Sequence, residues 1–209
     1  SKTREVSRGQ RSIEKKTRVI FRGKYNSETG MEYFQQFFAE RIEFFDLVIC
    51  SQDLPVDFPK LKNIEYKTYE ILDEELGELL KSADMAIGQF GLTDRVNWSI
   101  AHKIFEYALF GIPTICLTDS APNEIFNQEE FYFINKDELG EFLDNPSHQI
   151  MSCNNDFEIR SEKILRKYAK ICSEEAIAKR FIQILYDYGF LNRATHGHLD
   201  TFRLKKRKA

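Results

Sequence analysis

The run from His102 to Leu117 constrains the fold of this chain more than any other segment. Its first half has apolar residues at helical spacing and a single inward acid, and Gly111 then ends the helix. Pro113 precedes the apolar run 114–117, which is typical of a strand buried on both faces. A helix leading directly into such a strand predicts one unit of a parallel α/β sheet.

Short β-rich runs alternate with longer helical runs along most of the chain. Strands are predicted at 18–22, 47–51, 64–69, 85–90, 113–118 and 131–134, and helices at 28–43, 73–83, 97–110, 136–144, 156–171 and 173–188. Ser173, followed by two acids, is expected to start the last helix. This order predicts a Rossmann-like fold, with a mostly parallel six-stranded sheet, helices on both faces and C-terminal helices.

Three segments follow from the pattern. Residues 1–16 lack apolar periodicity and are expected to be a linker or extension, residues 17–190 form one α/β domain, and residues 191–209 form a basic tail. The charged N-terminus lacks the apolar centre of a secretion signal, and no run is apolar enough to span a membrane. Four widely spaced cysteines indicate free thiols in a reducing cytoplasm, without a zinc site.

The net charge of −3 conceals a strong segregation of charge. Residues 1–24 hold nine Lys/Arg and two acids, and residues 191–209 hold six and one, which leaves 15 basic and 30 acidic residues in 25–190. An acidic body repels a phosphate backbone, which excludes a general nucleic-acid binder. The basic ends have two interpretations: peripheral docking on anionic lipid, or solvated segments that lean on the acidic body.

The loop after the first strand has the ingredients of a phosphate site. Gly23 permits a tight turn, Lys24 supplies a cation, and a predicted helix N-terminus follows Gly30. The glycine spacing matches neither the dinucleotide fingerprint nor a P-loop, so an ordinary turn remains the alternative.

Lys103 and Glu106 lie three residues apart on one helix and project from the same side. Parallel sheets bind ligands beyond the carboxyl ends of their strands, where a carboxylate can accept both hydroxyls of a ribose. An ordinary surface ion pair between the two is the alternative. His102 is expected to be a surface histidine of the same helix.

Four stretches together resemble the C-terminal, donor-binding domain of GT-B-fold glycosyltransferases, of the family 4 or group 1 type. The specific one is Lys103-Ile104-Phe105-Glu106-Tyr107-Ala108-Leu109-Phe110-Gly111-Ile112-Pro113. The others, in the expected order, are 21–30, the Ser82-Ala83-Asp84 entry to a strand, and the helix from Ser173 to Tyr188.

The resemblance implies roles for individual residues. Glu106 would bind the ribose hydroxyls, Lys24 would face the diphosphate beside Gly23, and both would serve catalysis. Lys103 belongs to the same nucleotide-sugar site, and the backbone at Asp119, Ser120 and Ala121 would approach the sugar or phosphate. Arg22 could add charge near Lys24, although strand alternation can turn it away.

Three places depart from the family pattern. Thr29 stands where the family has a second phosphate-loop cation, Trp98 stands where its earlier glutamate falls, and Ser120-Ala121 replaces the glycine pair usual after the fifth strand. Trp98 has two interpretations, a stacking surface for a base or sugar and a packing residue.

The implied activity is glycosyl transfer, with retention, from a nucleotide-diphosphate sugar to a carbohydrate or lipid-linked acceptor, as in polysaccharide biosynthesis. No cofactor or metal is expected beyond the donor itself, and an N-terminal acceptor domain or partner subunit is required. Two alternatives remain: half of a nucleotide-sugar epimerase, and a non-catalytic module that binds nucleotide or a partner protein.

Overall fold

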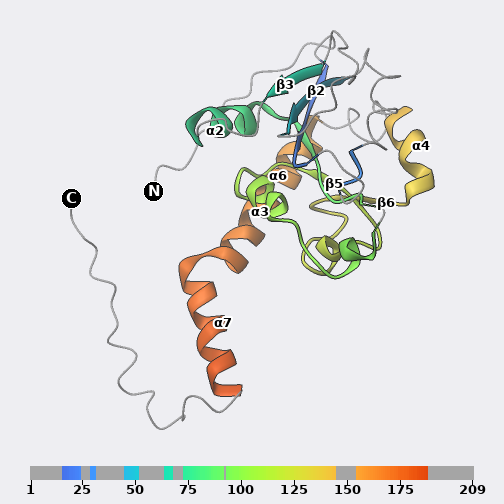
Figure 1. The fold of residues 1–209 in the computed structure, drawn as a ribbon. Helices are drawn as coiled ribbons and strands as arrows, with labels where there is room; N and C mark the ends of the chain where they lie inside the picture. The colour runs from blue at the N-terminus through green and yellow to red at the C-terminus, as the bar shows by residue number, and fades with distance from the viewer. Residues whose placement is uncertain are drawn as a thin grey trace. The chain divides into compact units, whose positions relative to one another are not determined.

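A single parallel sheet organises the protein (Figure 1). The computed structural model describes residues 16–24, 29–31, 45–51, 64–67, 73–91, 93–144 and 154–187. Six strands lie in the order β3-β2-β1-β4-β5-β6, and every neighbouring pair is parallel. Their bounds are β1 Thr17–Arg22, β2 Phe45–Cys50, β3 Ile64–Lys67, β4 Met85–Ile87, β5 Thr114–Leu117 and β6 Tyr132–Ile134. The predicted fold class is therefore confirmed.

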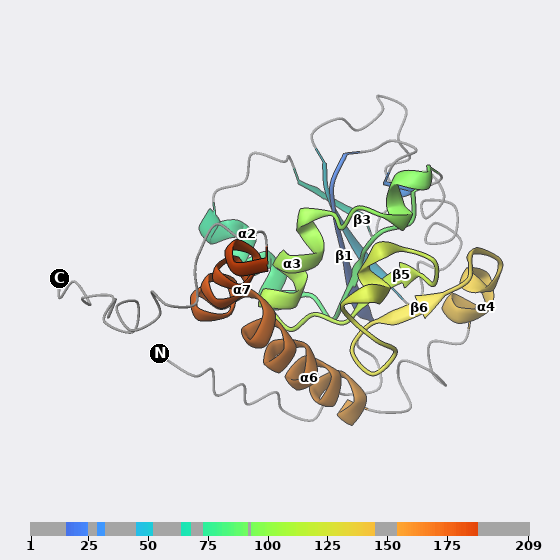
Figure 2. The same ribbon diagram turned by 90° about the horizontal axis from the view of Figure 1, so that it is seen from below.

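Alternating side chains of the strands build two cores, one on each face of the sheet. Val19 and Phe21 of β1 enter one core, whereas Ile20 between them enters the other. The second core is covered by α2 (Asp73–Ser82) and α3 (His102–Leu109), which lie near each other in Figure 2. Strands β4, β5 and β6 are mostly apolar and buried along their length, as in parallel sheets covered on both faces, whereas the edge strand β3 carries Glu65 and Lys67.

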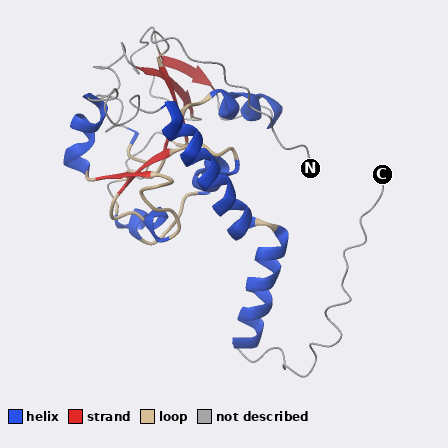
Figure 3. Ribbon diagram, turned by 180° about the vertical axis from the view of Figure 1, so that it is seen from behind, coloured by secondary structure: helices blue, strands red, loops and turns tan. Residues whose placement is uncertain are grey.

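The remaining helices of the described residues can be followed in Figure 3. They comprise three 3₁₀ turns, Asp94–Asn97, Ala121–Glu124 and Lys136–Glu138, and the α-helices α4 (Leu139–Asp144), α6 (Asn154–Cys172) and α7 (Glu174–Asp187). The predicted strands and helices recur in order, although β4 stops at Ile87, three residues short of the prediction. The predicted helix 28–43 falls almost wholly outside the described residues, as do the linker 1–16, except Lys16, and the tail 191–209.

The helix predicted from residue 97 begins later, at His102. Residues 94–97 form a separate 3₁₀ turn, and Ala101 has an extended backbone with a ψ of 139°. The predicted start was wrong because the Gln89 side chain forms hydrogen bonds with the backbone of Ser99 and Ala101, which holds these residues out of the helix.

The chain divides into one compact unit that ends at Arg166 and another that begins at Lys167. Within the second unit, the Ser173 hydroxyl accepts a hydrogen bond from the Ala176 backbone N–H at 3.1 Å. Ser173 is therefore the N-cap that the sequence predicted for α7.

Gly111 ends α3 with the two hydrogen bonds of a Schellman motif. The Ile112 N–H donates to the Tyr107 carbonyl at 3.0 Å, and the Gly111 N–H donates to the Ala108 carbonyl at 3.0 Å. Gly111 has a φ of +66°, which disfavours any residue with a side chain. Tyr107 and Ile112 then pack in the same core, so the cap also aims the chain into β5.

We expect Gly111→Ala to lower the free energy of unfolding by about 1–3 kcal/mol. The added Cβ would lie 2.5 Å from the Ser161 hydroxyl and 2.9 Å from Leu165 Cγ, in a backbone conformation that is already strained. Urea denaturation measures the change.

Gly77→Ala is the matched control, because a Cβ at Gly77 in α2 has no heavy atom within 4 Å. Its higher helix propensity should raise stability by about 0.5–1 kcal/mol. Equal effects at the two glycines would contradict the assignment of Gly111 as the cap.

Candidate functional site

The candidate site lies where β1 and β4 part at the carboxyl edge of the sheet. The two strands pair as far as Phe21 with Ile87, and β4 then turns away at Gly88. The chain order also reverses between these neighbours, since β2 and β3 lie to one side and β5 and β6 to the other. Open α/β sheets bind their ligands in the crevice at such a switch point.

Arg22, the last residue of β1, joins the strand to α3. Its backbone N–H donates to the Tyr107 hydroxyl at 2.9 Å, and its guanidinium forms an ion pair with Glu106. Tyr107 is fully buried, and burial raises the pKa of its hydroxyl far above the ordinary value, so it stays protonated. Strand alternation therefore does not turn the Arg22 side chain away from Glu106.

Glu106 is held on both sides of its carboxylate. One oxygen contacts Arg22, and the other lies 3.1 Å from His102 Nδ1. The Glu106 side chain is 20% exposed, whereas that of His102 is 88% exposed, in keeping with the predicted surface histidine. A carboxylate has about four acceptor positions, so each oxygen can still accept a further hydroxyl.

Lys103 does not pair with Glu106, in contrast to the surface ion pair considered from the sequence. Its ammonium lies 4.3 Å from the centre of the Phe21 ring, and the residue is only 8% exposed. Among the described residues, Lys103 Nζ is buried without a hydrogen-bond partner. Burial lowers the pKa of Lys103 from 10.5 to about 7, because desolvation disfavours the charged form.

The loop after β1 lies against the loop after β4. Gly30 has a φ of +70°, and a Cβ there would lie 2.3 Å from the Phe90 carbonyl oxygen, so only glycine permits this approach. Thr29 Oγ1 donates to the Lys24 carbonyl, and Lys24 itself is exposed. The described residues of the predicted phosphate loop thus lie at the carboxyl ends of β1 and β4.

Gln89 shapes the entry to α3 and was missed from the sequence. Its buried amide donates to the carbonyls of Val96, at 3.2 Å, and Ser99, and it accepts the Ala101 N–H at 2.9 Å. These bonds satisfy backbone groups that a helix starting at 97 would otherwise use. No sequence signal points to them, because a single glutamine after a strand has no periodic pattern.

The loop after β5 brings Asp119, Ser120 and Ala121 to the same edge, but in different environments. Ser120 is 3% exposed and its hydroxyl donates to the Leu117 carbonyl, Ala121 is 4% exposed, and Asp119 is exposed. Asp119 lines a cavity of about 210 Å³ together with Asp94 and Asn97. Of the neighbouring aromatics, Trp98 is 72% exposed and Phe90 is buried in the core.

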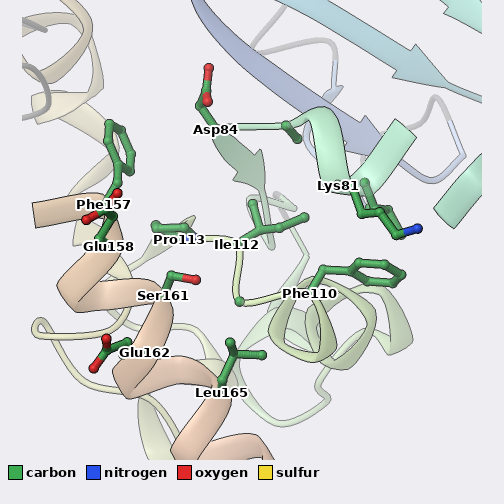
Figure 4. A pocket seen from close by; sticks show the side chains of 13 residues that line it. Lys81, Asp84, Phe110, Ile112, Pro113, Phe157, Glu158, Ser161, Glu162 and Leu165 are labelled. Carbon is green, nitrogen blue, oxygen red and sulfur yellow. The ribbon is translucent and has the colours of Figure 1, made fainter. Parts of the chain in front are cut away.

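A larger cavity, of about 300 Å³, lies at the opposite edge of the sheet (Figure 4). Asp84 and Pro113, which directly precede β4 and β5, line it together with Ser161 and Leu165 of α6. The carboxylate of Asp84 accepts the Arg18 N–H at 3.0 Å, so that acid holds β1 in place. This cavity is at the amino ends of the strands, away from Glu106.

The described part of the chain contains no cluster of three or more His, Cys, Asp or Glu that could hold a metal ion. Cys50 and Cys116 are buried free thiols, as predicted, and burial raises their pKa values to about 11 and about 12. None of the described helices is long and apolar enough to cross a bilayer.

No protein-family model and no curated protein sequence matches the chain. Solved structures do. The C-terminal domain of the glycosyl transferase group 1 family protein LpcC from Francisella tularensis matches 77% of this chain and 87% of its own, with 13% identity and a TM-score of 0.54. HepE from Anabaena, in complex with UDP-glucose, matches 84% of this chain with 11% identity and a TM-score of 0.59. Sucrose-phosphate synthase from Thermosynechococcus elongatus also matches 84%, with 16% identity and a TM-score of 0.62.

These similarities establish the fold. The chain is folded like the C-terminal domain of GT-B glycosyltransferases of group 1, which confirms the resemblance noted in the sequence. It spans 49% of the HepE chain and 46% of the sucrose-phosphate synthase chain.

We expect Gln89→Ala to speed amide hydrogen exchange at Ala101, because the substitution removes the acceptor of that N–H. Each buried group left unpaired costs about 1–3 kcal/mol. Hydrogen exchange followed by mass spectrometry or NMR measures the change, with amides of α2 as the internal reference. Unaltered protection at Ala101 would show that Gln89 does not hold the start of α3.

Proposed function

We propose that this protein is the donor-binding domain of a glycosyltransferase and binds a nucleotide-diphosphate sugar at the crevice between β1 and β4. The observation that carries the proposal is the position of Glu106. It is a half-buried carboxylate at the switch point of a parallel sheet, with both oxygens oriented by neighbours. The HepE structure with UDP-glucose has the same fold, which supports a nucleotide sugar as the ligand.

In this proposal, each side of the crevice binds one part of the donor. Glu106 accepts the two ribose hydroxyls with the acceptor positions that Arg22 and His102 leave open. Lys24 and the turn at Gly23 face the diphosphate. The backbone at Asp119, Ser120 and Ala121 contacts the sugar or phosphate.

The domain's task in the reaction is electrostatic. Bond cleavage at the sugar leaves a nucleoside diphosphate with additional negative charge, and fixed cations stabilise that charge without reorganising. Arg22 and Lys24, at the end of β1 and directly after it, supply positive charge there. Transfer with retention to a carbohydrate or lipid-linked acceptor is the reaction that the resemblance implies.

We infer that the acceptor site belongs to a second domain or a partner subunit. The matched length of about half of HepE and of sucrose-phosphate synthase supports this. A donor bound at the sheet edge must face a second surface that positions the acceptor for attack. Docking of the basic ends on anionic lipid would place the pair near a lipid-linked acceptor.

A second candidate function is a non-catalytic nucleotide-binding module. It is favoured by Thr29 and Trp98, which stand where the family has a cation and an acid. Both functions share the nucleotide site. They differ in whether the bound sugar is transferred once a domain or subunit that carries the acceptor site is added.

We expect calorimetric titration with UDP, GDP, ADP, CDP and their sugars to show binding of one nucleotide class. Glu106→Ala should weaken that binding by about 10–100-fold, because two hydroxyls lose a charged acceptor. Glu141→Ala, an exposed acid on α4, is the matched control and should bind like the wild type. The proposal fails if no nucleotide binds, or if binding is indifferent to Glu106→Ala in a variant with a wild-type circular dichroism spectrum.

A further inference from the structure

Lys103 is a buried lysine whose amine has no hydrogen-bond partner in the described part of the chain. Its Nζ has almost no solvent contact and no hydrogen bond to any described residue, and the face of the Phe21 ring lies 4.3 Å from it. A cation–π contact recovers roughly 0.5–2 kcal/mol, which is less than the several kcal/mol that desolvation of an ammonium costs. An unpaired buried lysine therefore needs a reason other than stability.

Its place in the fold suggests that reason. Lys103 belongs to the first turn of α3, and its Nζ lies beside Phe21 and Gly23, at the end of β1. A Cβ built on Gly23 would stand 3.3 Å from Phe21 Cζ and 3.7 Å from Nζ, so the ammonium lies directly beneath the turn. A phosphate bound at this turn would lie next to Nζ.

The phosphate loop itself lacks a cation at Thr29. That side chain is engaged within its own loop through the Lys24 carbonyl, and a threonine carries no charge. Lys24 is exposed to solvent, where the attraction to a phosphate is weak. Arg22 is already paired with Glu106, so a further cation that contacts the phosphates has to come from another element.

We propose that the Lys103 ammonium is the second diphosphate cation of this site and takes the place of the charge that Thr29 lacks. The inference rests on the proposed function and assigns the diphosphate to a specific buried group. The phosphate oxygens would provide the hydrogen-bond acceptors that Lys103 Nζ has in no described residue.

The unusual pKa of Lys103, about 7, gives this contact a signature. In the free protein Lys103 is largely neutral above pH 7, whereas a bound diphosphate favours the charged form, so binding takes up a proton. Affinity should therefore fall by up to about tenfold per pH unit above pH 7, until the pKa of the bound state is reached. Below pH 7 Lys103 is already charged and adds no slope.

The other groups around Nζ do not produce this signature. From β5, Cys116 stays a thiol because burial raises its pKa to about 12. From β1, the Arg22 guanidinium is permanently charged and paired with Glu106, which also contacts His102 on the same helix. A His102→Gln variant should therefore keep the slope above pH 7, whatever its affinity.

Lys103→Met is the decisive variant, since methionine keeps the length of the side chain and removes the charge. It should fold, with an unfolding midpoint equal to or above that of the wild type, because an apolar group replaces an unpaired buried amine. Its affinity for UDP, GDP or ADP, whichever binds the wild type, should fall by about 10–100-fold. Binding of the matching nucleoside, which has no phosphate, should not change.

Calorimetry at pH 7.5 in two buffers of different ionisation enthalpy measures the proton uptake. The wild type and Lys81→Met, an exposed lysine on α2, should take up a fraction of a proton, and Lys103→Met should take up none. Unchanged nucleotide affinity in Lys103→Met would overturn the inference and leave the proposed function standing. No nucleotide binding by the wild type would overturn both.

Discussion

Two consecutive residues of α3, Glu106 and Tyr107, attach this helix to Arg22 at the end of β1, and the candidate site depends on this attachment. The Gly23 N–H donates to the Cys50 carbonyl of β2, at 3.0 Å, so the Arg22 N–H faces the other way, toward β4. There β4 has already turned away, and the Tyr107 hydroxyl supplies the missing acceptor at 2.9 Å. The carboxyl ends of the two strands therefore part without an orphaned backbone donor at Arg22.

The same attachment determines where the charged side chains of α3 lie at the end of β1. Tyr107 is anchored in the core, so its neighbour Glu106 reaches Arg22, and Lys103, one turn earlier, passes over the strand end to Phe21. Lys103 and Glu106 are three residues apart on the helix and could form an ion pair with each other. Instead, Glu106 contacts Arg22 and Lys103 contacts the Phe21 ring, so the two side chains bind different residues at the end of β1. Two basic residues, Arg22 and Lys103, thus lie at the carboxyl end of β1 together with Glu106, in a chain whose residues 25–190 are strongly acidic.

The sequence allowed the architecture to be predicted, because buried parallel strands and amphipathic helices leave local patterns. Every described strand overlaps a predicted run, and Gly111 and Ser173 cap their helices as expected. The start of α3 could not be predicted, since Gln89 acts on a backbone segment up to 12 residues away through an amide. The partner of Glu106 was equally hidden, because Arg22 lies 84 residues earlier and periodicity says nothing about such pairs.

The ion pair between Arg22 and Glu106 could either block the proposed binding of a ribose to Glu106 or orient the carboxylate for it. Both side chains keep about a fifth of their surface exposed, at 17% and 20%, so solvent still reaches the pair. A guanidinium has five donors and the carboxylate about four acceptor positions, so one contact exhausts neither group. Arg22 and His102 fix the plane of the carboxylate from two sides, which lowers the entropy that a ligand would otherwise lose in ordering it. If the proposed function holds, a carboxylate that is held in this way and can accept further hydrogen bonds is preorganised for the two hydroxyls of a ribose.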